Sequence, residues 1–389
     1  MSTLTRATGR CGLWFALGAL LGCGDGGTGP APLQYTRLVV ASDAGSTEGI
    51  YDPSIVYPQG GSVGFLTYTS VPNKAAVHSR AAASTDSGRS WVFVGDVNTD
   101  SATTITTTGG DTAVCGATTC TGVWVHETSS LVYDPTDPDT TQRFKVFVHS
   151  YFVALPTPGH DTTLAYWYGN LSMYTTSFPT RGWSSEVKLL GWNSTSPVSS
   201  TGVRQNISTD PALASGYGNC WFIMEPGALV RGDTIDLATG CVQLAAGLPF
   251  DIRMMRSTDH GATWRFIAVL LDSTDALAVG SSTPRINGAD LFRVGSTTYL
   301  FATPEGPLTA GGYGYRGCLE FRFANVDAGQ LVRSGGVPVV QKRYTGDPGI
   351  FTGPCTADAG AKNAGVIVPK AGPTFSPYFQ IFTTGVGPP

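Results

Sequence analysis

The sequence has few charged residues and no run of basic ones. Of its 389 residues 13% are charged, and 24 Lys and Arg stand against 28 Asp and Glu, for a formal net charge of −4. Nucleic acids and anionic membrane surfaces are bound through dense positive charge, so this balance argues against both as partners. Glycine patterns of phosphate-binding loops and the Cys/His spacing of zinc sites are also missing, so no cofactor or metal site is predicted.

Long helical patterns are missing as well. From Leu33 onward, short β-rich runs alternate with turn residues, and the chain contains 50 Gly and 25 Pro. This pattern predicts an all-β domain with many turns over residues 33–389.

The N-terminus has the features of an export signal. Arg6 and Arg10 flank an apolar run, Cys11 to Leu21, that is too short to span a membrane. The run ends in Leu20-Leu21-Gly22-Cys23, which resembles a bacterial lipobox. The resemblance implies a signal peptide over residues 1–22, lipidation of Cys23, a flexible tether over residues 23–32, and residence in the bacterial cell envelope. The alternative is an ordinary secretory signal with an incidental cysteine.

Six further cysteines support export, because an even number in an exported chain predicts disulfides. Neighbours in the sequence suggest Cys115–Cys120 within a loop, Cys220–Cys241 across a hairpin, and Cys318–Cys355 between two late units of the fold.

An octapeptide occurs twice, as Ser84 to Trp91 (STDSGRSW) and as Ser257 to Trp264 (STDHGATW). Its residue types are those of a tight turn: Ser and Asp bond nearby N–H groups, Gly adopts positive φ, and Trp packs beneath. The string resembles the Asp box of sialidases and related β-propellers, which closes the turn between the third and fourth strands of a blade. The resemblance implies a β-propeller and assigns no catalytic role to the box.

The repeating units support five blades. Units that open with an acid or an amide begin near residues 52, 127, 210, 287 and 347. The lone strand from Gln34 to Val40 is expected to complete the last blade and close the ring. Six blades are the alternative, if one long unit holds two.

Because the first strand of each blade lines the central funnel, the opening residues should converge there. They are Asp52, Glu127, Asp210, Asn287 and Asp347. The D-P-[SAG]-[ILV] form at Asp52, Asp210 and Asp347 resembles the blade-opening motif of family 43 glycoside hydrolases. The resemblance implies that Asp52 is a general base and that Asp210 tunes the pKa of the acid.

The chain departs from that family where its acidic glutamate is expected, because Asn287 stands there and an amide cannot act as a general acid. Glu127, Glu225 and Glu305 are the candidates for the missing acid. A surface-loop interpretation of Glu225 and Glu305 is equally open.

Sugar binding also needs flat rings and polar groups. Tyr51 and Trp124 lie beside blade openers and are predicted to contact substrate, as are Asn287, Arg285 and Asp347. The other aromatics, including Tyr315, are interpreted as packing between blades. His126 and His149 are open as funnel ligands or a metal site, although lone histidines on strands are more often structural.

The leading hypothesis is an exported, surface-anchored, monomeric glycoside hydrolase acting on a poly- or oligosaccharide by carboxylate acid/base catalysis. The first alternative is a non-catalytic carbohydrate- or protein-binding propeller, favoured by Asn287. An exo-sialidase is the weaker alternative, because it needs a Tyr–Glu pair and converging arginines, for which Arg285, Arg316 and Arg343 are available. A calcium ion in the funnel stays open.

Overall fold

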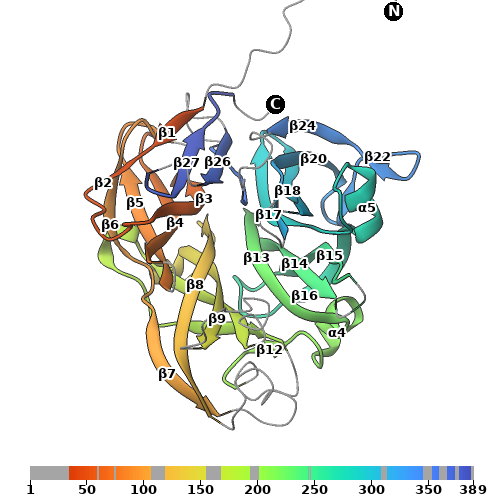
Figure 1. Cartoon of the computed structure of the whole chain (residues 1–389), viewed down its shortest axis with the longest axis horizontal. Coiled ribbons are helices and arrows are strands. Elements are labelled where there is room, and N and C mark those ends of the chain that lie inside the picture. Colours follow the sequence, from red (N-terminus) through yellow and green to blue (C-terminus); the bar gives the residue numbers. More distant parts are fainter. Residues whose placement is uncertain are drawn as a thin grey trace, which may run out of the picture. The chain divides into compact units, whose positions relative to one another are not determined.

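In the computed structural model, five antiparallel blades surround a central axis (Figure 1). The described residues are 35–58, 61–73, 76–106, 119–154, 168–192, 201–243, 245, 247–307, 313–344, 353–358, 366–372 and 376–386. Among them, no helix is long and apolar enough to cross a membrane.

The first three blades each contain four strands counted outward from the axis. Blade 1 consists of β3 (Gly49–Val56), β4 (Gly64–Asn73), β5 (Ala76–Ser84) and β6 (Trp91–Asp96), with β2 (Val40–Ala41) parallel to β6. Blade 2 consists of β8 (Thr119–Tyr133), β9 (Phe144–Ala154), β10 (Gly169–Thr176) and β11 (Val187–Gly191). Its edges carry β7 (Ser101–Thr106) on β8 and β12 (Gln205–Asn206) on β11. Blade 3 consists of β13 (Cys220–Arg231), β14 (Thr234–Gln243), β15 (Phe250–Ser257) and β16 (Arg265–Leu271).

The last two blades are less regular. Blade 4 consists of β17 (Ile286–Val294), β18 (Thr297–Pro307), β20 (Cys318–Asn325) and β24 (Val340–Tyr344), with β19 (Tyr313–Tyr315) on β18 and β21 (Gln330–Leu331) on β20. A separate ribbon joins β22 (Arg333–Ser334) to β23 (Val337–Pro338). Blade 5 consists of β25 (Thr356–Ala357), β26 (Val366–Ala371), β27 (Phe379–Thr383) and, from the other end of the chain, β1 (Thr36–Leu38). Short helices, η3 (Thr140–Gln142), η4 (Pro179–Arg181), α4 (Pro211–Tyr217) and α5 (Ser273–Ala278), lie in the connections.

The ring closes through its inner strands and through β1. Each inner strand contacts the next, in the order β3, β8, β13, β17, β25 and back to β3. Thr36 of β1 pairs with Thr383 of β27, so red and blue ribbon meet in Figure 1. This confirms five blades and the completion of the last blade by the opening strand.

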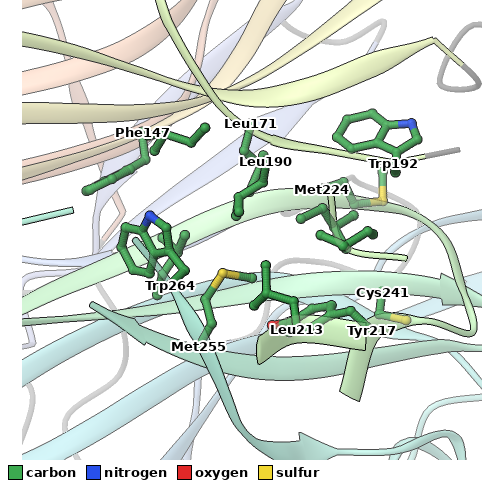
Figure 2. Close-up of a cluster of buried hydrophobic side chains, with 14 of the residues drawn as sticks. Phe147, Leu171, Leu190, Trp192, Leu213, Tyr217, Met224, Cys241, Met255 and Trp264 are labelled. Atoms are coloured by element: carbon green, nitrogen blue, oxygen red, sulfur yellow. The ribbon is translucent and has the colours of Figure 1, made fainter. Parts of the chain in front are cut away.

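Hydrophobic side chains fill the space between neighbouring blades. Figure 2 shows the cluster between blades 2 and 3, in which Phe147 and Leu171 meet Met255 and Trp264. Four similar clusters occupy the other blade interfaces. The hydrophobic core is therefore divided into five wedges, one between each pair of neighbouring blades. At the axis itself, the polar residues of the inner strands lie close to one another.

Two of the predicted disulfides are present. Cys220–Cys241 crosses the β13–β14 hairpin, and Cys318–Cys355 joins blade 4 to the start of blade 5. Cys120 is disulfide-bonded, and its predicted partner Cys115 lies outside the described residues, as do Cys23 and the signal and tether segments.

The repeated octapeptide forms the same turn twice, from the third to the fourth strand of blades 1 and 3. In blade 3, Gly261 N–H donates to Ser257 Oγ at 2.8 Å and Thr263 N–H donates to Asp259 Oδ1 at 2.9 Å. The equivalent bonds of blade 1 have the same lengths. Trp91 and Trp264 each retain 2% exposure beneath their turns.

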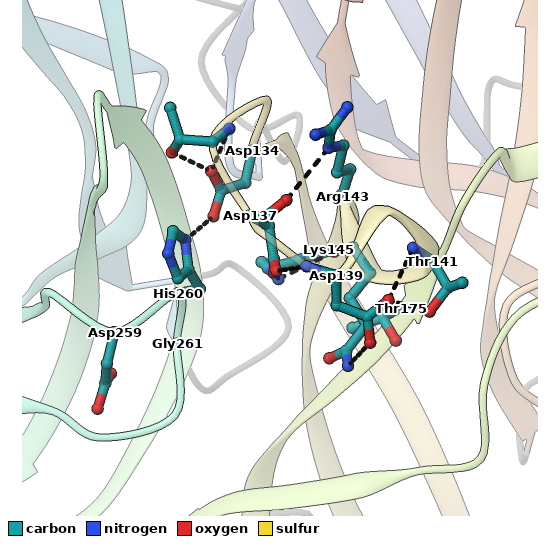
Figure 3. Close-up of polar contacts among 12 residues, drawn as sticks. Asp134, Asp137, Asp139, Thr141, Arg143, Lys145, Thr175, Asp259, His260 and Gly261 are labelled. Atoms are coloured by element: carbon teal, nitrogen blue, oxygen red, sulfur yellow. Dashed lines mark hydrogen bonds and ion pairs between the residues drawn. The ribbon is translucent and has the colours of Figure 1, made fainter.

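A polar contact links the second of these turns to blade 2 (Figure 3). His260 Nδ1 lies 2.8 Å from Oδ2 of the fully buried Asp134, and the neighbouring Asp137 pairs with Lys145 at 2.5 Å. Asp134, Asp137 and His260 are close enough to hold a metal ion. Because the ammonium group of Lys145 already lies at Asp137, we interpret the group as a hydrogen-bonded polar network that ties blade 2 to blade 3.

Asp259 should contribute to stability through its turn bonds alone. We expect Asp259→Ala to lower the free energy of unfolding by about 1–3 kcal/mol, because the Thr263 N–H and both hydroxyls of the turn lose their acceptor. Urea unfolding would measure this, with the exposed Asp233→Ala as control. Equal stability of the two variants would contradict a structural role for the turn.

Candidate functional site

The inner strands of the first four blades break their pairing at the same place. The register with the second strand shifts between Tyr51 and Ser54, Glu127 and Ser130, Met224 and Gly227, and Asn287 and Asp290. At each break one residue has positive φ: Asp52 (48°), Thr128 (51°), Glu225 (50°) and Gly288 (62°). A non-glycine residue in this region is uncommon, and such bulges occur often beside active sites, where they redirect side chains.

Asp52 is a buried carboxylate with good hydrogen-bond partners. Its side chain is 3% exposed, and Oδ2 accepts from the hydroxyls of Thr69 at 3.0 Å and Thr128 at 3.1 Å. Thr69 also accepts from the Thr128 N–H, so the bulge of blade 2 is held against Asp52. Burial and the nearby Glu127 raise the pKa of Asp52 well above its ordinary value, and the two hydroxyls oppose that rise.

Glu225 occupies the same bulge position in blade 3 with fewer partners. Oε1 accepts a short hydrogen bond from the hydroxyl of Tyr315, and Oε2 is buried with no described partner. Asn287 Nδ2 lies 3.4 Å from the same hydroxyl. Burial, and then the charge of Asp52, raise the pKa of Glu225 well above the ordinary glutamate value. Glu225 is therefore the carboxyl group best suited to retain a proton.

Asp52 and Glu225 meet at the axis from different blades. A Cβ placed on Gly353 would lie 3.5 Å from Asp52 Oδ1 and 3.7 Å from the ring of Tyr315, the partner of Glu225. Burial raises the pKa of both carboxyls, but Asp52 accepts from two hydroxyls that stabilise its ionised form, whereas Glu225 has one buried oxygen without a described partner. Asp52 is therefore the easier of the two to ionise.

Glu127 and Glu305 flank this pair. Glu127 Oε2 accepts from Tyr51 at 2.9 Å, and the ring of Tyr51 stacks on Phe379. Glu305 Oε2 lies 3.5 Å from Nη1 of Arg285, whose guanidinium also covers the ring of Phe250. Burial raises the pKa of Glu305 to about 7 against the opposing charge of Arg285, and burial also raises the pKa of Glu127.

The axis continues below the pair. A cavity of about 10 Å³, room for about one water molecule, touches Asp52, Thr128 and Asp290. Beyond Asp290 the opposite end of the channel widens to about 320 Å³, and its lining mixes apolar residues of the inner strands with Asp290, Arg293 and two tyrosines. Polar and charged groups thus occur along both parts of the axis. Within the described part of the chain, the carboxyl groups near the axis do not form a three-ligand metal cluster.

Two candidate residues lie away from the positions at which the sequence analysis placed them. Asp210 does not open blade 3: it is the N-cap of α4, where its side chain accepts from Ala212 N–H at 2.8 Å, and Pro211 begins the helix. Asp followed by Pro is also a strong helix-start signal. Trp124 lies on β8, but in a side pocket bounded by blade 2 and residues that follow blade 1, and not at the axis.

The structure places the other candidates as follows. Asp52, Glu127, Glu225 and Glu305 come together with Tyr51, Asn287 and Arg285 near the axis. Asp347 lies outside the described residues. Asn287 binds the partner of the candidate acid, so it does not occupy the acid's own position.

Sequence reasoning missed Tyr315, Thr69 and Thr128. Tyr315 is 90 residues from Glu225, so the sequence around either residue gives no sign of the hydrogen bond between them. A usable signal existed for Glu225 itself, because Glu225-Pro226-Gly227 repeats the acid–Pro–small form of Asp52-Pro53-Ser54.

Comparisons with known proteins identify no family. No protein-family model matches the sequence, and no curated protein matches it. The catalytic domain of a GH62 α-L-arabinofuranosidase from Coprinopsis cinerea is similar in structure, with 12% identity, a TM-score of 0.46, and coverage of 91% of this chain and 98% of that one. The arabinanase Arb43A of Bacillus subtilis has 11% identity, a TM-score of 0.46, and coverage of 86% and 92%.

A Hadza microbial sialidase is similar as well, with 12% identity and a TM-score of 0.43. The alignment covers 84% of this chain and 54% of the sialidase, so this chain spans about half of that protein. None of these similarities assigns an activity, and the functional conclusion has to come from the site.

The titration of Glu305 should be visible in stability. Its pKa is about 7 in the folded protein and 4.5 ordinarily, so the folded protein keeps a proton that the unfolded chain releases in this interval. The free energy of unfolding must therefore fall as pH rises through it. We expect Glu305→Gln to remove about 3 kcal/mol of this loss between about pH 4 and about pH 8.

Urea unfolding across that pH range measures the effect, and Glu48→Gln, half-buried before β3, is the control. A Glu305→Gln curve parallel to that of the unmodified protein would contradict a raised pKa.

Proposed function

We propose that the protein hydrolyses glycosidic bonds, with Glu225 as general acid and Asp52 as general base. The observation that carries this proposal is the pair of buried carboxyls on equivalent bulges of β3 and β13, one held by two hydroxyls and one left with an unpartnered oxygen. Hydrolysis of a glycosidic bond needs this combination of an ionised and a protonated carboxyl.

The reaction uses one water molecule. Glu225 gives its proton to the glycosidic oxygen as the bond to the anomeric carbon breaks. Asp52 removes a proton from the water whose oxygen bonds to that carbon. Asp52 then releases its proton to solvent, and Glu225 takes a proton back from solvent. Two sugars leave, each with a new free hydroxyl group at the broken bond.

The remaining residues support the pair. Tyr315 holds the Glu225 carboxyl in place, and its raised pKa keeps its hydroxyl a donor. The Tyr51–Glu127 pair and the Arg285–Glu305 pair supply hydroxyl, carboxylate and guanidinium groups for sugar hydroxyls. We therefore propose a poly- or oligosaccharide as substrate.

Export and anchoring are part of the proposal. Disulfides persist outside the reducing cytosol, and two of them lie in blades 3 to 5. Together with the lipobox-like string, they support a propeller over residues 33–389 that is held in the cell envelope by lipid on Cys23 through the tether of residues 23–32. We propose that this propeller is a monomer.

Removing either carboxyl should abolish hydrolysis. On an aryl-glycoside that the protein cleaves, found by screening a panel, we expect Asp52→Asn and Glu225→Gln each to lower kcat by about 10²–10⁴-fold. The control is Asp210→Asn, because Asn also caps a helix and residue 210 is the N-cap of α4.

Loss of activity in the control, or full activity in Asp52→Asn, would contradict the assigned roles. Glycan binding without hydrolysis of any panel member would support the non-catalytic carbohydrate-binding alternative.

A sialidase is the second candidate, favoured by the hydrogen bond between Tyr315 and Glu225. In that chemistry the tyrosine is the nucleophile and the glutamate its base. Of the three arginines named above, Arg343 bonds the Val279 carbonyl, Arg285 is paired with Glu305, and Arg316 donates to the Tyr315 carbonyl at 3.5 Å.

Tyr315→Phe separates the two functions. If Glu225 is the acid, loss of the hydroxyl raises its pKa further, because the Tyr315 bond lowers it. The basic limb of the pH–rate profile should then move to higher pH, with kcat changed by less than about tenfold. A loss above about 10³-fold, on an aryl sialoside, would establish tyrosine as the nucleophile.

A further inference from the structure

A second polar pocket lies beside the axis, between blade 2 and the segment that follows blade 1. Its volume is about 330 Å³, at the lower end of the range of small-molecule sites, about 300–1,000 Å³. Trp124 and His126 of β8, Tyr174 of β10, and Glu186 and Lys188 beside or within β11 line it. Three serines and a threonine contribute hydroxyls to the same wall.

A chain of hydrogen bonds fixes the proton on His126. His126 Nδ1 lies 2.8 Å from Ser150 Oγ, which donates to Ser172 Oγ at 3.3 Å. Ser172 Oγ lies 2.5 Å from two acceptors, Glu186 Oε1 and Asn170 Oδ1. Both oxygens accept, so the Ser172 proton points away from Ser150. With Ser150 donating to Ser172, Nδ1 of His126 is the donor to Ser150 and carries the ring proton.

Nε2 of His126 is consequently a hydrogen-bond acceptor. The residue is 6% exposed, and no described residue hydrogen-bonds Nε2. Burial lowers the pKa of the ring to about 4, so it is neutral at ordinary pH. Because His126 lines the pocket, a ligand hydroxyl or a water molecule there can donate to this acceptor.

The other groups of the pocket restrict what that ligand is. Glu186 and Lys188 bring opposite charges, so neither an anion nor a cation is favoured overall. The half-buried indole of Trp124 offers a flat surface and has Lys188 Nζ 5.2 Å from its ring centroid. A flat ring beside alternating donors and acceptors suits a neutral molecule with an apolar face and many hydroxyls.

We propose that this pocket is a second saccharide-binding site, which holds one or two neutral sugar units against Trp124 with a sugar hydroxyl donating to Nε2 of His126. The site lies off the axis and does not depend on hydrolysis at Asp52 and Glu225. It would keep a long glycan on the protein independently of the catalytic pair.

The proposal is tested with an array of neutral oligosaccharides, followed by calorimetric titration of the best binder. We expect binding that survives in Asp52→Asn and weakens at least about tenfold in both Trp124→Ala and His126→Phe, because each removes one of the two contacts. Trp221→Ala, which alters a half-buried tryptophan of blade 3, should bind as the unmodified protein does.

Circular dichroism melting identifies any variant that fails to fold. Trp124→Phe keeps a flat ring, so it should retain most of the affinity that Trp124→Ala loses. Binding equal in all variants except Asp52→Asn would overturn the proposal, since it would place every sugar on the axis. Preference for sulfated or uronate oligosaccharides would overturn the neutral ligand class. Failure of hydrolysis on the aryl-glycoside panel would leave these binding results unaffected.

Discussion

Four carboxyl groups buried around one axis cannot all be ionised together. Asp52, Glu127, Glu225 and Glu305 each have a raised pKa, and burial is the largest cause for every one of them. A group in this position must find hydroxyls, a counter-charge or a proton. Asp52 accepts from two threonines, Glu127 and Glu225 each accept from a tyrosine, and Glu305 lies beside an arginine. Glu225 alone of the four keeps a buried oxygen without a described partner. The proposed chemistry follows from these unequal solutions.

The architecture could be predicted from sequence because the information is local. The octapeptide contains the Ser, Asp and Gly groups whose bonds recur in both turns, and two copies place two blades. The five units and the closing strand follow from turn spacing and from the rule that a propeller leaves no open edge. The start of blade 3 was misplaced because Asp-Pro favours two local structures, a strand entry and a helix start. At Asp210 the following Ala-Leu-Ala run favours the helix.

The residues near the axis could largely be named from the sequence, including Tyr51, Asn287 and Arg285, but their partners could not. Asp52, Glu127, Glu225 and Glu305 were all named, but the distinction between base and acid depends on partners elsewhere in the chain. Tyr51 and Glu127 are 76 residues apart, and Tyr315 and Glu225 are 90. Such pairs exist only after the ring has closed, and no spacing within one strand encodes them. The bulges are similarly hidden, since Thr128 and Gly288 take the same backbone turn as the acids without sharing their chemistry.

The pairing of β1 with β27 also determines how the domain would respond to force. If the chain is held by its N-terminus, as the proposed anchor requires, tension reaches the fold first at Thr36 to Leu38. These residues form the outermost strand of blade 5, and their ladder to β27 would be loaded before any inner strand. Under tension the edge of blade 5 would therefore separate first. The bulges of β3 and β13, and the carboxyls on them, would keep their geometry.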